Sequence, residues 1–156
     1  MAVFVGEFEQ NIDAKHRLAI PAALREQLDA EADGRNFYLV LGPDHHLWLY
    51  PDQYYRRLIQ PLQKNPFPSR SAQKLALLFA FARLVKPDAQ GRVVLPERCM
   101  QRASISNDLM LVGKGDHIEL WPADEWERFV VDAMPRYGDD LLDAGDGLDP
   151  ALLPDN

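Results

Sequence analysis

The sequence predicts an α+β fold, mainly β with added helices, built from two diverged copies of one β-β-α-β-β unit. Two internal alignments indicate this repeat. Asp13–Pro21 matches Asp88–Pro96 at a separation of 75 residues, and His46–Pro51 matches His117–Pro122 at a separation of 71. A unit of about 45 residues buries little surface alone. We therefore expect hairpins of one copy to pair with hairpins of the other and close a small β-barrel with a pseudo-twofold axis.

Each copy is predicted to begin with a hairpin. In the first copy, Phe4–Asp13 and Arg17–Ile20 are the expected strands, and Ala14–His16 is the loop between them. Such a loop favours a left-handed residue in its third position. Gly91 supplies that residue in the second copy at no steric cost, and His16, which tolerates a positive φ better than most side chains, occupies the position in the first.

A helix is expected after each of these hairpins. Pro21 suits the first turn of a helix over Ala22–Ala30, with Leu24 and Leu28 on the buried face. Pro96 begins the equivalent helix of the second copy. The length difference between the copies falls in the loop after this helix, where insertions and deletions are tolerated.

Each copy then ends in a second hairpin, whose connection contains turn-forming residues. The expected strands are Phe37–Leu41 and Leu47–Tyr50 in the first copy, and Leu109–Val112 and Ile118–Trp121 in the second. The connections are Gly42-Pro-Asp-His and Gly113-Lys-Gly-Asp.

Helices are expected around these units, over Asp52–Leu62, Ser69–Phe79 and Ala123–Met134, with a hinge-like break at Asn65–Pro68. Pro135 is expected to end the last helix. The predicted organisation is a first unit (7–54), a helical connection (55–81), a second unit (82–125), a C-terminal helix (126–137) and an acidic flexible tail (138–156).

The net charge of −7 is concentrated near the C-terminal end. Residues 135–156 hold six Asp and one Arg, whereas residues 1–85 hold ten Lys or Arg and nine Asp or Glu. The folded part is thus nearly balanced, and the overall negative charge does not argue strongly against a nucleic-acid partner.

Other features narrow the class of protein. The longest strongly apolar stretch, Leu75–Ala82, is far below the roughly 20 residues of a membrane-spanning helix, so a soluble, cytoplasmic protein is expected. Cys99 is the single cysteine, which excludes an intrachain disulfide and a Cys-based zinc cage, and we expect it in the core. No cofactor or metal is predicted.

An Asp-x-x-x-Arg turn occurs in both copies. Asp13 and Arg17 flank the first loop, and Asp88 and Arg92 flank the second, so each carboxylate can orient a guanidinium toward phosphate oxygens or a guanine edge. A surface salt bridge that stabilises a hairpin is the plainer interpretation. The recurrence makes the turn a property of the unit, and on the residues alone both interpretations stay open.

These motifs resemble the MraZ family over about residues 4–134. The resemblance rests on Phe4-x-Gly6, Ile12–Pro21, Leu47–Pro51, Asp88–Pro96 and Glu119–Pro122. It implies tandem AbrB-like swapped-hairpin (double-split) β-barrel units. It also implies a bacterial, nucleoid-associated transcription regulator that forms a homo-oligomeric ring. Such a regulator binds short promoter repeats in double-stranded DNA upstream of the division and cell-wall gene cluster, and has no small-molecule substrate.

The resemblance also implies which residues contact DNA. Its DNA contacts would be Arg17 and Arg92, oriented by Asp13 and Asp88, with Lys15 on the first loop and Arg25 on the first helix assisting. Two loop positions depart from the family, because His16 stands where glycine is usual and Gln90, beside Gly91, replaces a charged residue. The first loop has more cations, so we expect Arg17 to matter more than Arg92.

Two other functions, an enzyme and a protein-interaction module, compete with a regulator. An enzyme would have to use His16, His45, His46 and His117 with Asp44 and Asp116, but their spacing matches no catalytic or metal motif. A structural role is favoured for His46 and His117, and no catalytic residue is predicted. The stronger alternative is an oligomeric protein-interaction module without its own DNA specificity, with an aromatic surface of Trp48, Tyr50, Trp121 and Trp126. The operator, the direction of regulation and the number of subunits stay open.

Overall fold

The computed structural model describes residues 1–63 and 67–155. Its contacts define two units, Met1–Ala123 and Asp124–Asn156, which we describe separately. The first unit contains every strand of the described residues, and the second is helical. The predicted α+β class is confirmed.

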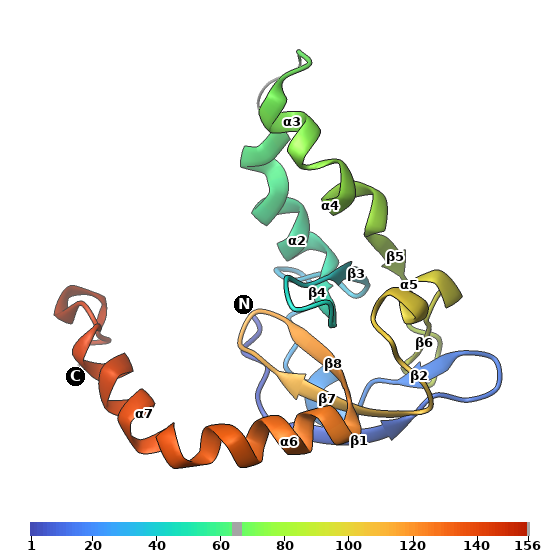
Figure 1. The fold of residues 1–156 in the computed structure, drawn as a ribbon. Helices are drawn as coiled ribbons and strands as arrows, with labels where there is room; N and C mark the ends of the chain where they lie inside the picture. The colour runs from blue at the N-terminus through green and yellow to red at the C-terminus, as the bar shows by residue number, and fades with distance from the viewer. Residues whose placement is uncertain (64–66, 156) are drawn as a thin grey trace. The chain divides into compact units, whose positions relative to one another are not determined.

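Two antiparallel sheets form the first unit (Figure 1). The larger sheet has the order β1-β7-β8-β4-β3-β5, and the smaller one pairs β2 with β6. The strands are β1 (Glu7–Asn11), β2 (Arg17–Ala19), β3 (Phe37–Leu41), β4 (Leu47–Pro51), β5 (Arg83–Val85), β6 (Arg92–Val94), β7 (Asp108–Gly113) and β8 (Ile118–Pro122).

Strands of the two copies pair with each other at four places, as predicted, while β3–β4 and β7–β8 pair within one copy. β1 pairs with β7, β3 with β5, β4 with β8 and β2 with β6. Strands at the same distance from the two edges of the larger sheet are equivalent and come from opposite copies: β1 and β5, β7 and β3, β8 and β4. This is the expected pseudo-twofold relation. The described strands nevertheless form two separate ladders, and β1 and β5 remain as edges, so no closed barrel ladder is present among them.

The register shows where the pseudo-twofold axis passes. Leu18 lies opposite Val93, which is the equivalent residue 75 positions later. In the larger sheet, Trp48 lies opposite Glu119, its equivalent 71 positions later. An axis between two copies must pass through such self-equivalent pairs, so it runs through the centre of both ladders.

The prediction that each first hairpin pairs its own two strands was wrong. Asp13 N–H donates to the Arg17 carbonyl at 3.1 Å, so the turn forms, but β1 and β2 then separate. Ile12 N–H already donates to the Asn107 carbonyl of the other copy. Exchange of strands between copies buries Leu18 and Val93 completely, which a free hairpin could not do.

One core cluster joins both copies. Its largest fully buried side chains are Phe4, Phe37, Leu18, Ile20, Leu24, Leu39, Leu47, Leu49, Leu95, Leu109, Leu111 and Ile118. Cys99 belongs to this cluster, as predicted, and burial raises the pKa of its thiol. The cluster includes Leu18 of β2 and Val93 of β6, the strands that follow the two loops.

The helix after Pro21 is shorter than predicted. α1 spans Ala22–Arg25, with Leu24 fully buried, whereas the prediction extended to Ala30. The Asp29 and Asp33 carboxylates accept backbone N–H groups at 3.0 Å, and such local bonds compete with helix formation. The equivalent helix, α5 (Glu97–Arg102), follows Pro96.

The connection between the copies is helical in several pieces. α2 (Asp52–Ile59) continues as the 3-10 helix η1 (Gln60–Gln63), and the predicted Ser69–Phe79 helix is divided into α3 (Arg70–Lys74) and α4 (Ala76–Phe81). Ser69 caps α3 by accepting the Ala72 N–H at 3.1 Å. The predicted break at Asn65–Pro68 lies partly outside the described residues.

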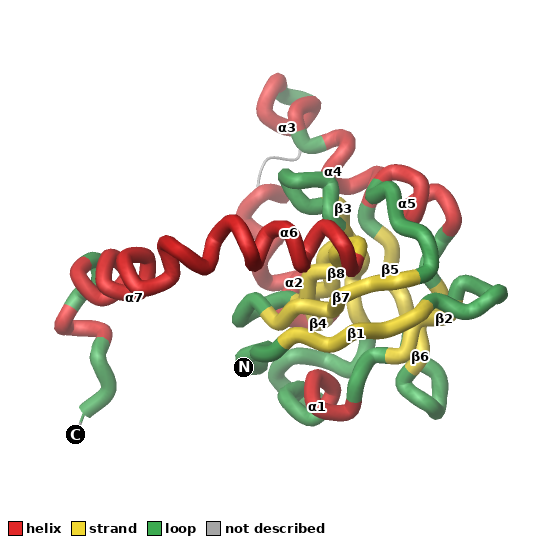
Figure 2. Tube along the Cα trace, turned by 60° about the horizontal axis from the view of Figure 1, so that its bottom comes forward, coloured by secondary structure: helices red, strands yellow, loops and turns green. Residues whose placement is uncertain are grey.

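The second unit carries more helix than the sequence suggested. α6 (Ala123–Ala133), η2 (Met134–Arg136), α7 (Tyr137–Asp146) and η3 (Pro150–Leu152) follow one another (Figure 2). α6 ends one residue before the predicted Met134, and Pro135 lies in η2, whereas the residues of the expected tail are helical over most of 137–152. Asp139 and Asp140 lie in the first turn of α7, where negative charge stabilises a helix.

In residues 1–63 and 67–155, no helix is both long and apolar enough to cross a membrane.

Candidate nucleic-acid interface

The Asp13 carboxylate organises the first turn. Its Oδ1 accepts the N–H groups of Lys15 at 2.9 Å and of Arg17 at 2.8 Å, and its Oδ2 accepts Arg17 Nε at 2.6 Å. His16 closes the turn by donating its N–H to the Asp13 carbonyl, with a φ of 59°. The predicted left-handed residue in the third loop position is confirmed.

The second turn repeats this arrangement bond for bond. Asp88 Oδ1 accepts the N–H groups of Gln90 at 2.9 Å and Arg92 at 3.0 Å, and Oδ2 accepts Arg92 Nε at 2.9 Å. Gly91 occupies the left-handed position with a φ of 77°. The same geometry therefore arises from two diverged sequences.

Each turn presents a fixed arginine with unused donors. The Nε atom of each arginine donates to the aspartate of the same turn. No hydrogen bond within the described residues uses the terminal Nη atoms of Arg17 or Arg92. The arginine side chains are about a third exposed, at 32% and 30%. Backbone hydrogen bonds from Arg17 and Arg92 are the main reason that the pKa values of Asp13 and Asp88 are lowered. Both carboxylates are thus charged, and the arginines keep a planar donor pair for an anion.

The β2–β6 ladder brings the two turns together. Leu95 N–H donates to the His16 carbonyl at 2.8 Å, and Ile20 N–H donates to the Gly91 carbonyl at 3.0 Å. Figure 2 shows both loops projecting beside β2 and β6. Arg17 and Arg92, predicted from separate parts of the chain, therefore belong to one surface.

The structure places Arg25 at the second turn, which sequence reasoning did not anticipate. Its Nε donates to the Ile20 carbonyl at 2.9 Å, and its side chain covers Gly91, which is buried. Lys15 stays on the first loop and is exposed. Arg25 comes from the first copy but lies over Gly91 of the second, since the strands are exchanged.

The histidines considered for catalysis have structural surroundings. His46 stacks on Trp121 and His117 stacks on Trp48, with ring centroids 3.9 and 4.0 Å apart, so each histidine packs across the two copies. His16 and His45 hold positive φ values in turns. Among the described residues, no group of three or more His, Cys, Asp or Glu could hold a metal ion.

His117 is held between two carboxylates. Its Nδ1 lies 2.7 Å from Asp116, and its Nε2 lies 2.8 Å from buried Glu119. Burial lowers the pKa of His117, but the hydrogen bonds to Glu119 and Asp116 outweigh it and leave that pKa raised. Tyr54 donates its hydroxyl to Asp116 at 2.6 Å, and this bond is the main reason its pKa is raised to about 12.

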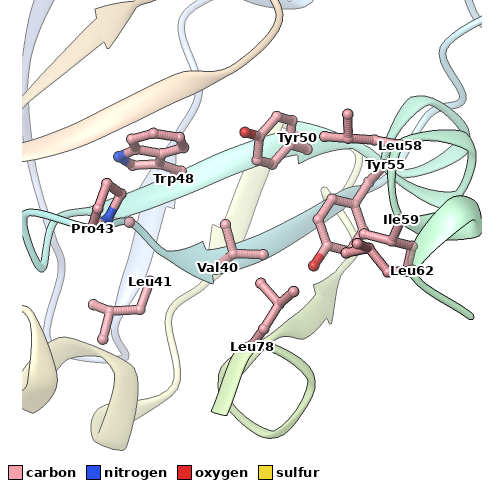
Figure 3. Close-up of a pocket in the computed structure, with 11 residues that line it drawn as sticks. Val40, Leu41, Pro43, Trp48, Tyr50, Tyr55, Leu58, Ile59, Leu62 and Leu78 are labelled. Atoms are coloured by element: carbon pink, nitrogen blue, oxygen red, sulfur yellow. The ribbon is translucent and has the colours of Figure 1, made fainter. Parts of the chain in front are cut away.

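The predicted aromatic surface is divided in the structure. Trp121 is buried in β8 and Trp126 belongs to the second unit, whereas Trp48 and Tyr50 line an apolar groove of about 330 Å³ (Figure 3). Trp48 Nε1 and the Tyr55 hydroxyl are buried without a hydrogen-bond partner among the residues that the structure describes. The groove is lined by Val40, Leu41, Gly42, Pro43, Trp48, Tyr50, Tyr55, Leu58, Ile59, Leu62 and Leu78.

Comparison with known proteins gives one consistent result. The family model described as "MraZ protein, putative antitoxin-like" matches residues 3–77 and 78–136, one match for each copy. Proteins named transcriptional regulator MraZ are similar over most of both chains. The one from Clostridium tetani is 33% identical over 81% of this chain and 87% of its own. The one from Limosilactobacillus fermentum is 37% identical over 94% of this chain and 99% of its own.

A third relative, the transcriptional regulator MraZ of Heliobacterium modesticaldum, is 32% identical over 86% of this chain and 92% of its own. The two family matches divide the chain between the copies, and the exchanged strands agree with the AbrB-like swapped-hairpin fold of that family. The chain belongs to the MraZ family.

Proposed function

We propose that this protein is a sequence-specific DNA-binding transcriptional regulator that contacts DNA through its two Asp-x-x-x-Arg turns. The observation that carries the proposal is the pair of matched turns: each holds an arginine by Nε and leaves its Nη atoms for an anion. Arginine forks of this kind bind phosphate oxygens and the O6 and N7 atoms of guanine. The names of the relatives support a regulator rather than an enzyme.

Assembly into a ring is part of the proposal. The first unit is nearly balanced in charge, and one or two arginines at each turn neutralise few phosphates, so one chain binds DNA weakly. Several chains with equivalent turns on one face engage promoter repeats spaced by about one helical turn, roughly 10 base pairs. Once one turn has bound, the other turns of the ring are held at a high effective concentration near the remaining repeats, so weak contacts together give tight binding. Occupancy of the promoter then depends on the number of repeats.

The target and location of the regulator follow from the resemblance to the family. The proposed operators are short promoter repeats upstream of the division and cell-wall gene cluster, and the proposed location is the cytoplasm, at the nucleoid. The acidic second unit, with six Asp in residues 138–156, repels DNA and limits binding without repeats.

The Arg17→Ala variant separates this proposal from its alternative. We expect the variant to lose affinity for a duplex with several repeats, measured by fluorescence anisotropy, while its oligomeric state, measured by light scattering, stays unchanged. Arg57→Ala, which removes an exposed arginine from α2, is the matched control and should bind like wild type. Equal affinity of wild type, Arg17→Ala and Arg57→Ala would count against the proposal that the turns contact DNA.

The alternative function is an oligomeric protein-interaction module. The apolar groove favours it, because the groove exposes Leu58 and Leu62, and because the Trp48 and Tyr55 donors have no hydrogen-bond partner within residues 1–63 and 67–155. Subunit contacts in a ring would also use such a surface. An intact wild-type oligomer that does not bind the repeat duplex would favour this alternative.

A further inference from the structure

The apolar groove beside β4 has an open lip and an unsatisfied donor in its wall. Leu58 and Leu62 line the groove and are 45% and 48% exposed. Tyr55 is 4% exposed, and its hydroxyl has no hydrogen-bond partner among the described residues. Figure 3 shows that hydroxyl pointing toward Val40 and Leu78, which also line the groove. The groove therefore fits an occupant that is largely apolar and carries hydrogen-bond acceptors.

The helices that border this groove carry only positive charge. From residue 53 to residue 81, through α2, η1, α3 and α4, the chain holds five Lys or Arg and no Asp or Glu. The cations of this stretch that the structure describes are all exposed, namely Arg56, Arg57, Arg70 and Lys74. An occupant with negative charge beside its apolar side chains is therefore favoured.

The C-terminal segment, residues 137–153, has the complementary composition. Residues 138–156 hold six Asp, five Leu and no Lys or Arg, and each of these leucines is at least 52% exposed. In α7, Tyr137 and Leu141 are four residues apart and share one face of the helix. Asp139, Asp143 and Asp146 lie on the opposite face. The segment is thus amphipathic, with an apolar face and an acidic face.

The apolar face of α7 is uncovered within the described residues. Tyr137 and Leu141 are 61% and 60% exposed, and a Cβ at Gly138 or Gly145 would meet nothing within 4 Å outside the helix's own nearby backbone. A short helix gains most of its stability by burying such a face. The family model ends at residue 136, so the C-terminal segment lies outside the part of the chain that it matches.

We infer that the C-terminal segment of one chain docks in the apolar groove of a second copy, with its leucines in the groove and its aspartates beside the basic helices. An amphipathic helix in an apolar groove is a recurring mode of recognition. The inference rests on the proposed ring and names a contact between its neighbours that the proposal leaves open. Contact between two different surfaces of identical chains is heterologous, and a series of such contacts closes into a ring.

Disulfide trapping between two different chains tests the inference. One full-length chain carries Leu62→Cys at the lip of the groove, and the other carries Leu148→Cys after α7. The chains bear different tags and are co-expressed, so a cross-link that joins both tags is intermolecular. Cys99 is buried, and burial raises the pKa of its thiol, so it stays out of the exchange.

Val94→Cys in place of Leu62→Cys is the matched control. Val94 is 56% exposed, close to the 48% of Leu62, but it lies on β6 and does not line the groove. Docking holds the Leu62→Cys and Leu148→Cys thiols at a high effective concentration, so their cross-link should form on the order of tenfold faster than the control cross-link.

A second pair of substitutions tests the charges. Arg56→Glu/Arg57→Glu, in the chain with Leu62→Cys, reverses two exposed cations of α2 and should slow the cross-link. Salt at 1 M, where screening acts beyond about 3 Å, should also slow it. Thermal unfolding checks that each variant folds.

Three results overturn the inference. They are equal rates for Leu62→Cys and Val94→Cys, a rate that Arg56→Glu/Arg57→Glu leaves unchanged, and a cross-link that forms only when both cysteines are placed in one chain. A wild type that is monomeric by light scattering contradicts the proposed ring itself. A wild type that is oligomeric, without the faster cross-link, contradicts the docking of the C-terminal segment alone.

Discussion

Val93 and Val94 provide a matched test of the strand exchange between the copies. They are adjacent in β6, but Val93 is fully buried opposite Leu18, whereas Val94 is 56% exposed. Replacement of either valine by Ala removes the same two methyl groups, and with them the β-branch that favours a strand. Any difference between the two variants therefore reports burial and not strand propensity.

The expected magnitude follows from that burial. Two buried methyl groups contribute about 1.6 kcal/mol by transfer from water, and the cavity left behind raises the destabilisation by Val93→Ala to about 2–3 kcal/mol. Val94→Ala should change the free energy of unfolding by less than about 0.5 kcal/mol beyond the shared propensity effect. A difference of about 2 kcal/mol corresponds to roughly 30-fold in the unfolding equilibrium constant.

Urea unfolding followed by tryptophan fluorescence measures both variants at one fixed protein concentration, because association shifts apparent stability. Trp48 and Trp121 lie in the first unit and report on its core. Equal destabilisation of the two variants would refute the described β2–β6 register and the packing of the two copies on each other.

Two further predictions concern charge. The raised pKa of His117 means that its contribution to stability is complete below its ordinary pKa of 6.5 and is lost as the pH rises through the folded value. The free energy of unfolding of wild type should therefore fall from pH 6 to pH 9 more than that of His117→Gln, by urea unfolding; parallel curves would contradict the His117 network. Deletion of residues 138–156 changes the net charge from −7 to −1 and should tighten binding to the repeat duplex at low salt but not at high salt. A full-length variant with its six tail Asp changed to Asn should behave like the deletion, and unchanged low-salt affinity in both would refute the repulsion.

The features that the sequence predicted are those fixed by local pattern and by the internal repeat. The second hairpins match their predicted ranges closely, because turn residues bound them on both sides. The Asp-x-x-x-Arg turns were predicted because their bonds span four residues. The role of His16 as a left-handed residue also followed from its position in the loop.

The features that were not predicted from the sequence depend on contacts between residues that are distant in the chain. The partners of β1 and β2 are set by burial of Leu18 against Val93, which no local pattern encodes. The position of Arg25 over Gly91 appears only after the strands are exchanged. The early end of α1 depends on the Asp29 and Asp33 carboxylates, and α7 forms despite the glycines in its sequence.

The central claim is that the two turns form the DNA-binding surface. Fluorescence anisotropy across a salt series, with a duplex of several promoter repeats and a scrambled duplex, tests it with wild type and the Arg17→Ala/Arg92→Ala variant. The account predicts tight, repeat-dependent and salt-sensitive binding by wild type, and loss of that binding in the double variant with its fold intact. Binding that is absent in wild type, or equal in both proteins, would contradict it.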